Sequence, residues 1–140
     1  MSSEQNKAIM RRFNDASVVN DRESLETLLA PDFVIHQADG PGNREAYLQH
    51  LSYYAAAFSD ATFTVEEQIA EGDRVVTRGT FSATHSGDFQ GMPPSGKRFA
   101  IDAVLFDRIV DGKIVEHRSQ FDTLSMLQQL GVIPAPEQEG

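Results

Sequence analysis

The sequence contains no cysteine. This absence excludes disulfide bonds, thiolate metal sites and a cysteine nucleophile. No apolar run approaches the roughly 18 residues that a membrane-spanning helix requires. The opening segment, MSSEQNKAIMRRF, lacks the apolar stretch of a secretory signal. We therefore expect a cytoplasmic protein that has no membrane partner.

Positive charge is scarce as well. The chain has 12 Lys and Arg against 21 Asp and Glu, which gives a formal net charge of −9. Such a balance offers no basic patch to phosphates, so we expect no nucleic-acid partner. A length of 140 residues with 40% hydrophobic residues is typical of one globular domain. We predict a single domain over residues 1–133 and a flexible tail over 134–140, where the sequence is polar and rich in proline.

Helical signals dominate the first third of the chain. N-cap residues predict helices that begin at Ser2 or Ser3, at Asn20 or Asp21, and at Asn43. Pro31 is expected to end the second helix, and a short strand is expected over residues 32–37. The apolar face of the third helix is predicted from a helical repeat of large side chains: Tyr47, Leu51, Tyr54 and Phe58.

From Thr62 onward the apolar period changes to two, which predicts strands. The expected strands include residues 74–85, 98–110 and 113–121, and a final helix is expected to end at Gly131. Helices followed by an antiparallel sheet indicate an α+β fold. We expect a curved, mostly antiparallel sheet that wraps against the N-terminal helices and encloses one apolar pocket.

Three segments carry a family resemblance: HSGDFQGMPPSGKRF, FDRIVDGKIVEHR and LQQLGVIP. They resemble the turns and packing residues of the SnoaL-like polyketide cyclases, also called ester cyclases, in the nuclear transport factor 2-like superfamily. The resemblance implies a cone-shaped α+β barrel with a deep apolar cavity and association through the outer sheet face. It also implies intramolecular aldol condensation without metal or cofactor, in which an aspartate is the general acid/base and a histidine assists.

The sequence departs from that family where the chemistry is expected. The last strand reads Glu116-His117-Arg118-Ser119, so Ser119 stands at the position of the family aspartate. The position of the assisting histidine is occupied by Leu105. If the chain is catalytic, we expect proton transfer by His117 and His85, with Asp122 as the nearest replacement carboxylate.

Further residues are expected to contact a substrate: Ser119, Leu105, Tyr47, His36 and Phe121. Several candidates also have a structural alternative, and His117 can be a cavity-wall histidine bonded to a backbone carbonyl. Tyr47 lies on a core stripe, His85 can hold the Gly-Pro loop, Asp122 can cap the final helix, and His36 has the parity of an exposed residue. The histidines lack the i, i+4 spacing of a helical metal site, so we expect no metal.

The leading hypothesis is therefore an enzyme that acts on a hydrophobic, oxygenated small molecule by cyclisation, isomerisation or hydration rather than by aldol closure. The alternatives are a binding module that has lost the catalytic pair, and a scaffold whose side chains fill the cavity. A buried titratable group with a shifted pKa beside the cavity would favour the enzyme. Val104 and Phe106 are predicted on the outer sheet face, which suggests a homodimer or a higher homo-oligomer.

Overall fold

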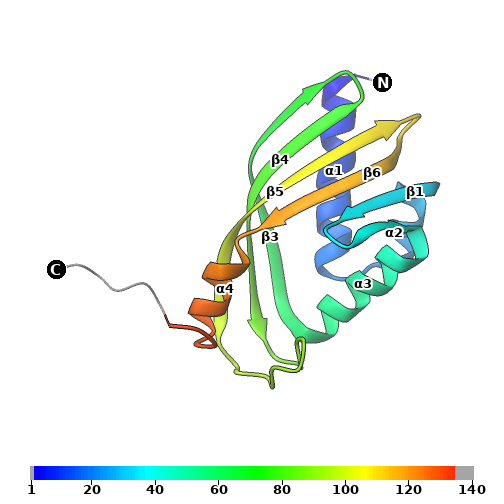
Figure 1. Cartoon of the computed structure of the whole chain (residues 1–140). Coiled ribbons are helices and arrows are strands. Elements are labelled where there is room, and N and C mark those ends of the chain that lie inside the picture. The colour runs from blue at the N-terminus through cyan, green and yellow to red at the C-terminus, as the bar shows by residue number, and fades with distance from the viewer. Residues whose placement is uncertain (1, 135–140) are drawn as a thin grey trace.

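The computed structural model describes residues 2–134, so the predicted tail lies outside it except for Pro134 (Figure 1). The helices before the main strands are α1 (Ser3–Val18), α2 (Arg22–Leu28) and α3 (Arg44–Ala57). Each begins with a side chain that accepts a hydrogen bond from a backbone N–H of the first turn; these N-caps are Ser2, Asp21 and Asn43. The predicted helix starts are thus confirmed, because polar caps satisfy the otherwise unpaired donors.

The strands are β1 (Leu29–Gln37), β2 (Gly40–Asn43), β3 (Phe58–Glu71), β4 (Arg74–His85), β5 (Arg98–Val110) and β6 (Lys113–Phe121), and α4 (Thr123–Gln129) follows them. They form one sheet in the order β2-β1-β6-β5-β4-β3, in which only β1 and β6 are parallel. The α+β architecture with a mostly antiparallel sheet is therefore confirmed. Among residues 2–134, no helix combines the length and apolarity needed to span a membrane.

Strand β1 begins earlier than the sequence predicted. Leu29 already pairs with Ile114, and the register with β6 then shifts before Val34. Pro31 falls inside this irregular segment, where a residue without an N–H is tolerated. Pairing with β6 therefore extends β1 through Pro31, which was expected only to end the second helix.

The inner face of the sheet carries two apolar clusters. Strand β5 illustrates the alternation, since its odd-numbered residues from Phe99 to Ile109 are buried. The first apolar cluster, which we call the helix cluster, packs α1, α2 and α3 against the sheet. It includes Ile9, Phe13, Leu25, Phe33, Leu48 and Leu105. The second, the end cluster, lies at α4 and the loop 86–97, and includes Phe58, Phe89, Phe99, Met126 and Leu130.

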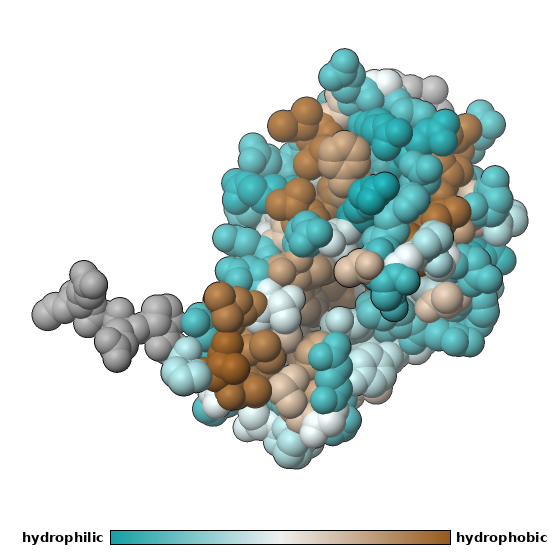
Figure 2. All heavy atoms as spheres, in the orientation of Figure 1, coloured by the Kyte–Doolittle hydropathy of each residue, from teal (hydrophilic) through white to brown (hydrophobic). Residues whose placement is uncertain are grey.

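An opening lies between these clusters. Pairing of β1 with β6 ends at Ile35 and His117, so residues 118–121 of β6 are not paired with β1. Figure 2 shows a hollow between α4 and α3, next to this part of the sheet. Partly buried side chains pack against each cluster, Leu51 and Phe63 against the first, Tyr54 and Phe81 against the second. His117 is thus the last residue of β6 that is paired with β1.

Candidate active site

The most unusual polar contact inside the protein joins β5 to β6. Asp107 and His117 lie directly opposite each other, with His117 Nδ1 2.5 Å from Asp107 Oδ1. The two residues are only 1% and 2% exposed. Burial raises the pKa of Asp107, and the charge and hydrogen bond of His117 oppose that rise. We call this pair the Asp–His dyad.

The hairpin between β5 and β6 fixes the dyad. Asp111 and Gly112 both have positive φ, at 51° and 77°, as a two-residue type I′ turn requires. The turn pairs Ile109 with Ile114, and the register then shifts by one residue between Ile109 and Arg108, which places Leu105 opposite Ser119 and Asp107 opposite His117. The dyad is therefore the next inward-facing pair beyond the two positions at which the sequence departs from the resembled family.

Sequence reasoning missed Asp107, although a signal was present. Asp107 has the inward parity of Leu105, whereas the hairpin turn alone would pair it with Glu116, and a register shift between Arg108 and Ile109 brings it opposite His117. Asp122 was expected as the replacement carboxylate instead. A buried carboxyl group with a raised pKa is the kind of feature that was expected to favour an enzyme over a binding module.

Aromatic rings surround His117. Its ring centroid lies 5.3 Å from that of Tyr47 and 5.6 Å from that of Phe13. Tyr47 is buried, and this burial, together with the nearby Asp107, raises the pKa of its hydroxyl. A tyrosine hydroxyl with an ordinary pKa of about 10 is already protonated at neutral pH, so the Tyr47 hydroxyl can donate a hydrogen bond.

The remaining hydrogen-bonding capacity of the dyad is free. Nδ1 of His117 is taken by Asp107, and Nε2 makes no hydrogen bond among residues 2–134. Oδ2 of Asp107 is buried and has no partner in the same part of the chain. The dyad can therefore exchange a proton at Nε2 while Oδ1 holds the ring in one orientation.

Three predicted contact residues lie along the same face. Leu105 is buried, Ser119 opposite it is partly buried, and Phe121 is 40% exposed. The Phe121 ring meets the Phe81 ring edge to face, with centroids 5.8 Å apart. These residues extend from the dyad toward the α4 end of the opening.

His85 lies apart from the dyad, in the end cluster. It is 1% exposed, and its Nδ1 lies 3.1 Å from Ser95 Oγ. Its backbone carbonyl accepts from Gly96 N, and its backbone N–H donates to Lys97 O. These contacts hold the loop 86–97, which is the structural alternative considered for this residue.

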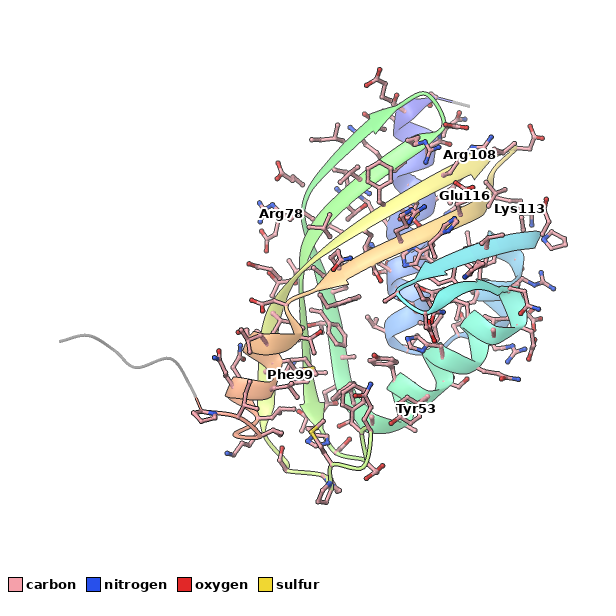
Figure 3. All side chains as sticks on the ribbon, viewed as in Figure 1. Tyr53, Arg78, Phe99, Arg108, Lys113 and Glu116 are labelled. Carbon is pink, nitrogen blue, oxygen red and sulfur yellow. The ribbon has the colours of Figure 1, made fainter. Side chains whose placement is uncertain are left out.

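Two other predicted site residues lie outside the hollow. Asp122 is exposed and accepts a hydrogen bond from Ser125 N at 3.1 Å, so it caps α4. His36 Nε2 lies 3.9 Å from Glu116 Oε1, and Glu116 has the parity opposite to that of His117. Figure 3 shows labelled Glu116 and Arg108 on neighbouring strands of the outer side. His36 therefore faces outward, and its expected contact with a substrate is not supported. Strand alternation directs its side chain away from the dyad.

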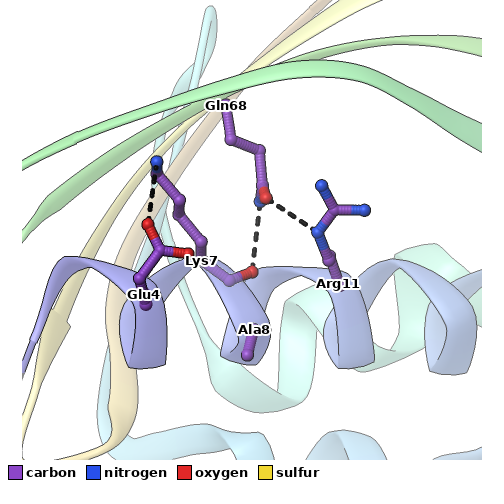
Figure 4. A pocket seen from close by; sticks show the side chains of 5 residues that line it. All are labelled: Glu4, Lys7, Ala8, Arg11 and Gln68. Carbon is purple, nitrogen blue, oxygen red and sulfur yellow. Dashed lines mark hydrogen bonds and ion pairs between the residues drawn. The ribbon is translucent and has the colours of Figure 1, made fainter.

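A second groove lies between α1 and β3, and it is polar (Figure 4). Gln68 donates to Lys7 O at 3.1 Å and accepts from Arg11 Nε at 2.9 Å. None of the predicted site residues lines this groove. Across residues 2–134, no group of three or more His, Asp and Glu side chains is placed to hold a metal ion.

Comparison with known proteins decides the family. The model of the SnoaL-like polyketide cyclases matches residues 7–130. This chain is a member of that family. It is 33% identical over 119 residues to the aklanonic acid methyl ester cyclase DauD of Streptomyces sp. (strain C5), covering 78% of this chain and 73% of the relative. It is 38% identical over 97 residues to the nogalonic acid methyl ester cyclase of Streptomyces nogalater, covering 69% and 72% of the two chains.

Solved structures agree with this SnoaL-like assignment. Wild-type IdmH of Streptomyces antibioticus superposes with a TM-score of 0.81 at 36% identity, over 91% of this chain and 99% of IdmH. AclR of Streptomyces galilaeus superposes with a TM-score of 0.89 at 31% identity, over 98% and 87%. Within the SnoaL-like fold, this chain carries its buried carboxylate–imidazole pair at Asp107 and His117.

Proposed function

We propose that this SnoaL-like protein is a cyclase-type enzyme in which His117 transfers protons and Asp107 positions its ring. The Asp–His dyad carries the proposal, because burying a carboxyl group beside an imidazole costs stability and is characteristic of catalytic sites. The proposed reaction is aldol-type ring closure without metal or organic cofactor. Isomerisation or hydration would use the same proton-transfer group.

The proposed mechanism begins with the tautomer of His117. The Asp107 carboxylate accepts the Nδ1–H, which leaves the lone pair of Nε2 free to remove a proton from a carbon between two carbonyl groups. The nearby carboxylate stabilises the imidazolium that forms. The enolate then attacks a second carbonyl of the same molecule, and holding both carbonyls in place supplies much of the rate.

Tyr47 is proposed to orient the substrate. The centroid of its ring is 5.3 Å from that of His117, and its hydroxyl is protonated at neutral pH. A protonated hydroxyl can donate a hydrogen bond to a substrate carbonyl and to the enolate oxygen that develops there. Ser119 is proposed to offer a second hydroxyl contact, while Leu105 and Phe121 supply apolar contact.

The proposed substrate is a hydrophobic, oxygenated small molecule. The relatives are named for aklanonic and nogalonic acid methyl esters, and the aromatic side chains around the hollow suit a ligand of similar character. We therefore propose aklanonic acid methyl ester as the probe. The alternative remains a binding module, which would take up the ester without converting it.

The test is to compare wild-type protein with His117→Gln on aklanonic acid methyl ester, with product measured by chromatography. We expect turnover by wild type and a loss of about 10² to 10⁴-fold in the variant. Calorimetry on the same samples establishes whether the ester binds. Binding by both proteins without turnover by wild type would favour the binding module.

A second copy of this chain is proposed as a protein partner. Val104 and Phe106 are 39% and 42% exposed on the outer sheet face, and Ile69 nearby is 64% exposed. Arg74 lies over the Phe106 ring at 6.0 Å. Figure 2 shows the apolar side chains of this face as brown spheres among polar ones. A surface of this kind is suited to pairing with another sheet.

A further inference from the structure

His50 lies on the side of α3 that connects the two apolar clusters. It follows Tyr47 by three positions and precedes Tyr54 by four, so the three side chains form one stripe of the helix. Tyr47 belongs to the helix cluster and Tyr54 packs against the end cluster. His50 is therefore placed between the clusters, where the hollow lies.

The ring contacts extend this stripe to the dyad. His50 lies 4.5 Å from Tyr54 and 6.5 Å from Tyr47 between ring centroids, and Tyr47 in turn lies 5.3 Å from His117. One tyrosine ring thus contacts both imidazoles. A ligand that packs along Tyr47 would have an imidazole within reach at each end.

The flank of α3 that holds His50 is open to solvent. The opposite flank is covered, since Ser52 there accepts a hydrogen bond from Asn20 beyond the end of α1. His50 is exposed, whereas His117 is 2% exposed. His50 can therefore exchange protons with water while a ligand covers His117.

The chemistry proposed above needs a second proton-transfer group. Ring closure breaks an α C–H bond and forms a C–C bond to the attacked carbonyl carbon, and the carbonyl electron pair becomes an alkoxide that must take up a proton. The usual assisting position is Leu105, which has no proton to give. Resting on the proposed function, we infer that His50 is the general acid that protonates this alkoxide. His117 releases the α-proton to water after closure, and His50 takes a proton back from water.

The surroundings of His50 support this role. Partial burial lowers the pKa of His50, and Asp39 in the turn between β1 and β2 opposes that shift. Tyr47 and Tyr54 are the other titratable side chains in ring contact with it, both from α3. A protonated imidazole with a lowered pKa is a stronger acid toward an alkoxide than an ordinary histidine.

The experiment separates the two proton transfers. Aklanonic acid methyl ester is incubated in D₂O with wild type, His50→Gln, His50→Phe, His117→Gln and the control His36→Gln. Deuterium incorporation at the α-carbon, read by NMR, reports removal of the α-proton, and chromatography reports ring closure. His36 is a matched control because it is a histidine on the outer face, beside Glu116.

We expect both His50 variants to keep α-proton exchange and KM but to lose kcat by about 10²-fold or more. A general acid must be protonated, so the wild-type kcat should fall as pH rises past the His50 pKa, and this alkaline limb should vanish in His50→Gln. His117→Gln should lose both exchange and closure, and His36→Gln should match wild type.

Wild-type closure by His50→Gln, with an unchanged pH profile, would overturn the inference and leave the proposed function intact. A wild-type kcat in His50→Phe but not in His50→Gln would also overturn the inference, because a phenylalanine ring can pack against Tyr54 but cannot donate a proton. Neither exchange nor closure by wild type would overturn the proposed function, and the inference with it.

Discussion

The imidazole of His117 and the carboxylate of Asp107 face each other across β5 and β6, 2.5 Å apart and almost fully buried. Burying an unpaired carboxylate at this depth would be strongly unfavourable. The imidazole reduces this cost because it donates a hydrogen bond to the carboxylate. His117 is also the last residue of β6 that is paired with β1. The pair therefore combines a buried carboxyl group with an imidazole whose Nε2 makes no hydrogen bond to residues 2–134.

The pKa of Asp107 makes stability depend on pH. Because burial raises this pKa, the folded protein binds more protons than the unfolded chain between the ordinary Asp value and the raised value. Stability should therefore fall as pH rises through that window. Asp107→Asn should flatten this dependence, as measured by thermal melting between pH 4 and pH 8. The matched control is Asp102→Asn on the exposed face of β5, which should melt like wild type; equal slopes for all three proteins would contradict the assignment.

The family positions should still accept a catalytic pair. Leu105 and Ser119 are direct partners on the inner face, so Leu105→His with Ser119→Asp places an imidazole beside a carboxylate. In a His117→Gln background we expect this double change to restore about 10²-fold or more of the lost ring closure. Product formation from aklanonic acid methyl ester measures it. No gain in a folded protein that binds the ester would show that these positions lie outside the reacting site.

The outer face should hold two copies together. Phe106→Glu or Val104→Arg introduces a charge into the proposed contact, and burying an unpaired charge is costly. Light scattering should show a dimer or larger for wild type and a lower mass for either variant. Glu67→Gln, whose carboxylate pairs with Arg78, provides a polar control. A monomeric wild type at high micromolar concentration would exclude the proposed contact.

Gly131 ends α4 with a φ of +78°, as the sequence predicted. A side chain in this left-handed conformation is strained, and a Cβ here would lie 2.8 Å from Lys97 Nζ. Gly131→Val should lower the free energy of unfolding by roughly 1 kcal/mol or more. Urea denaturation measures the change, with Gly131→Asn expected to cost less. An unchanged midpoint for the valine variant would mean that the backbone relaxes without strain.

Much of the fold could be predicted from the sequence because its signals are local. N-caps, alternating apolar residues and the Asp111-Gly112 turn each act within a few positions, and the helices and strands they predicted are present. The early start of β1 could not be predicted in this way. It depends on pairing with β6, a strand that lies about 80 residues further along the chain.

The site was only partly predictable. His117 was expected at the cavity from its family position and Tyr47 as a substrate contact on a core stripe, and the structure brings their rings together. The sequence left two alternatives for Asp122, a helix cap or a catalytic carboxylate, and two for His36, an exposed residue or a substrate contact. The choice between them depends on the three-dimensional path of the chain. Asp107 was missed because the hairpin turn alone would pair it with Glu116, and the register shift that brings it opposite His117 depends on the packing of the folded sheet.

The central claim is that Asp107 holds His117 in the tautomer that accepts a proton at Nε2. The most direct measurement is kcat for ring closure by Asp107→Asn, alongside its melting temperature at the assay pH. An asparagine amide can donate to Nδ1 and thereby place the ring proton on Nε2, so kcat should fall by about 10² to 10⁴-fold while the protein stays folded. A folded Asp107→Asn protein that turns over aklanonic acid methyl ester at the wild-type rate would contradict the account.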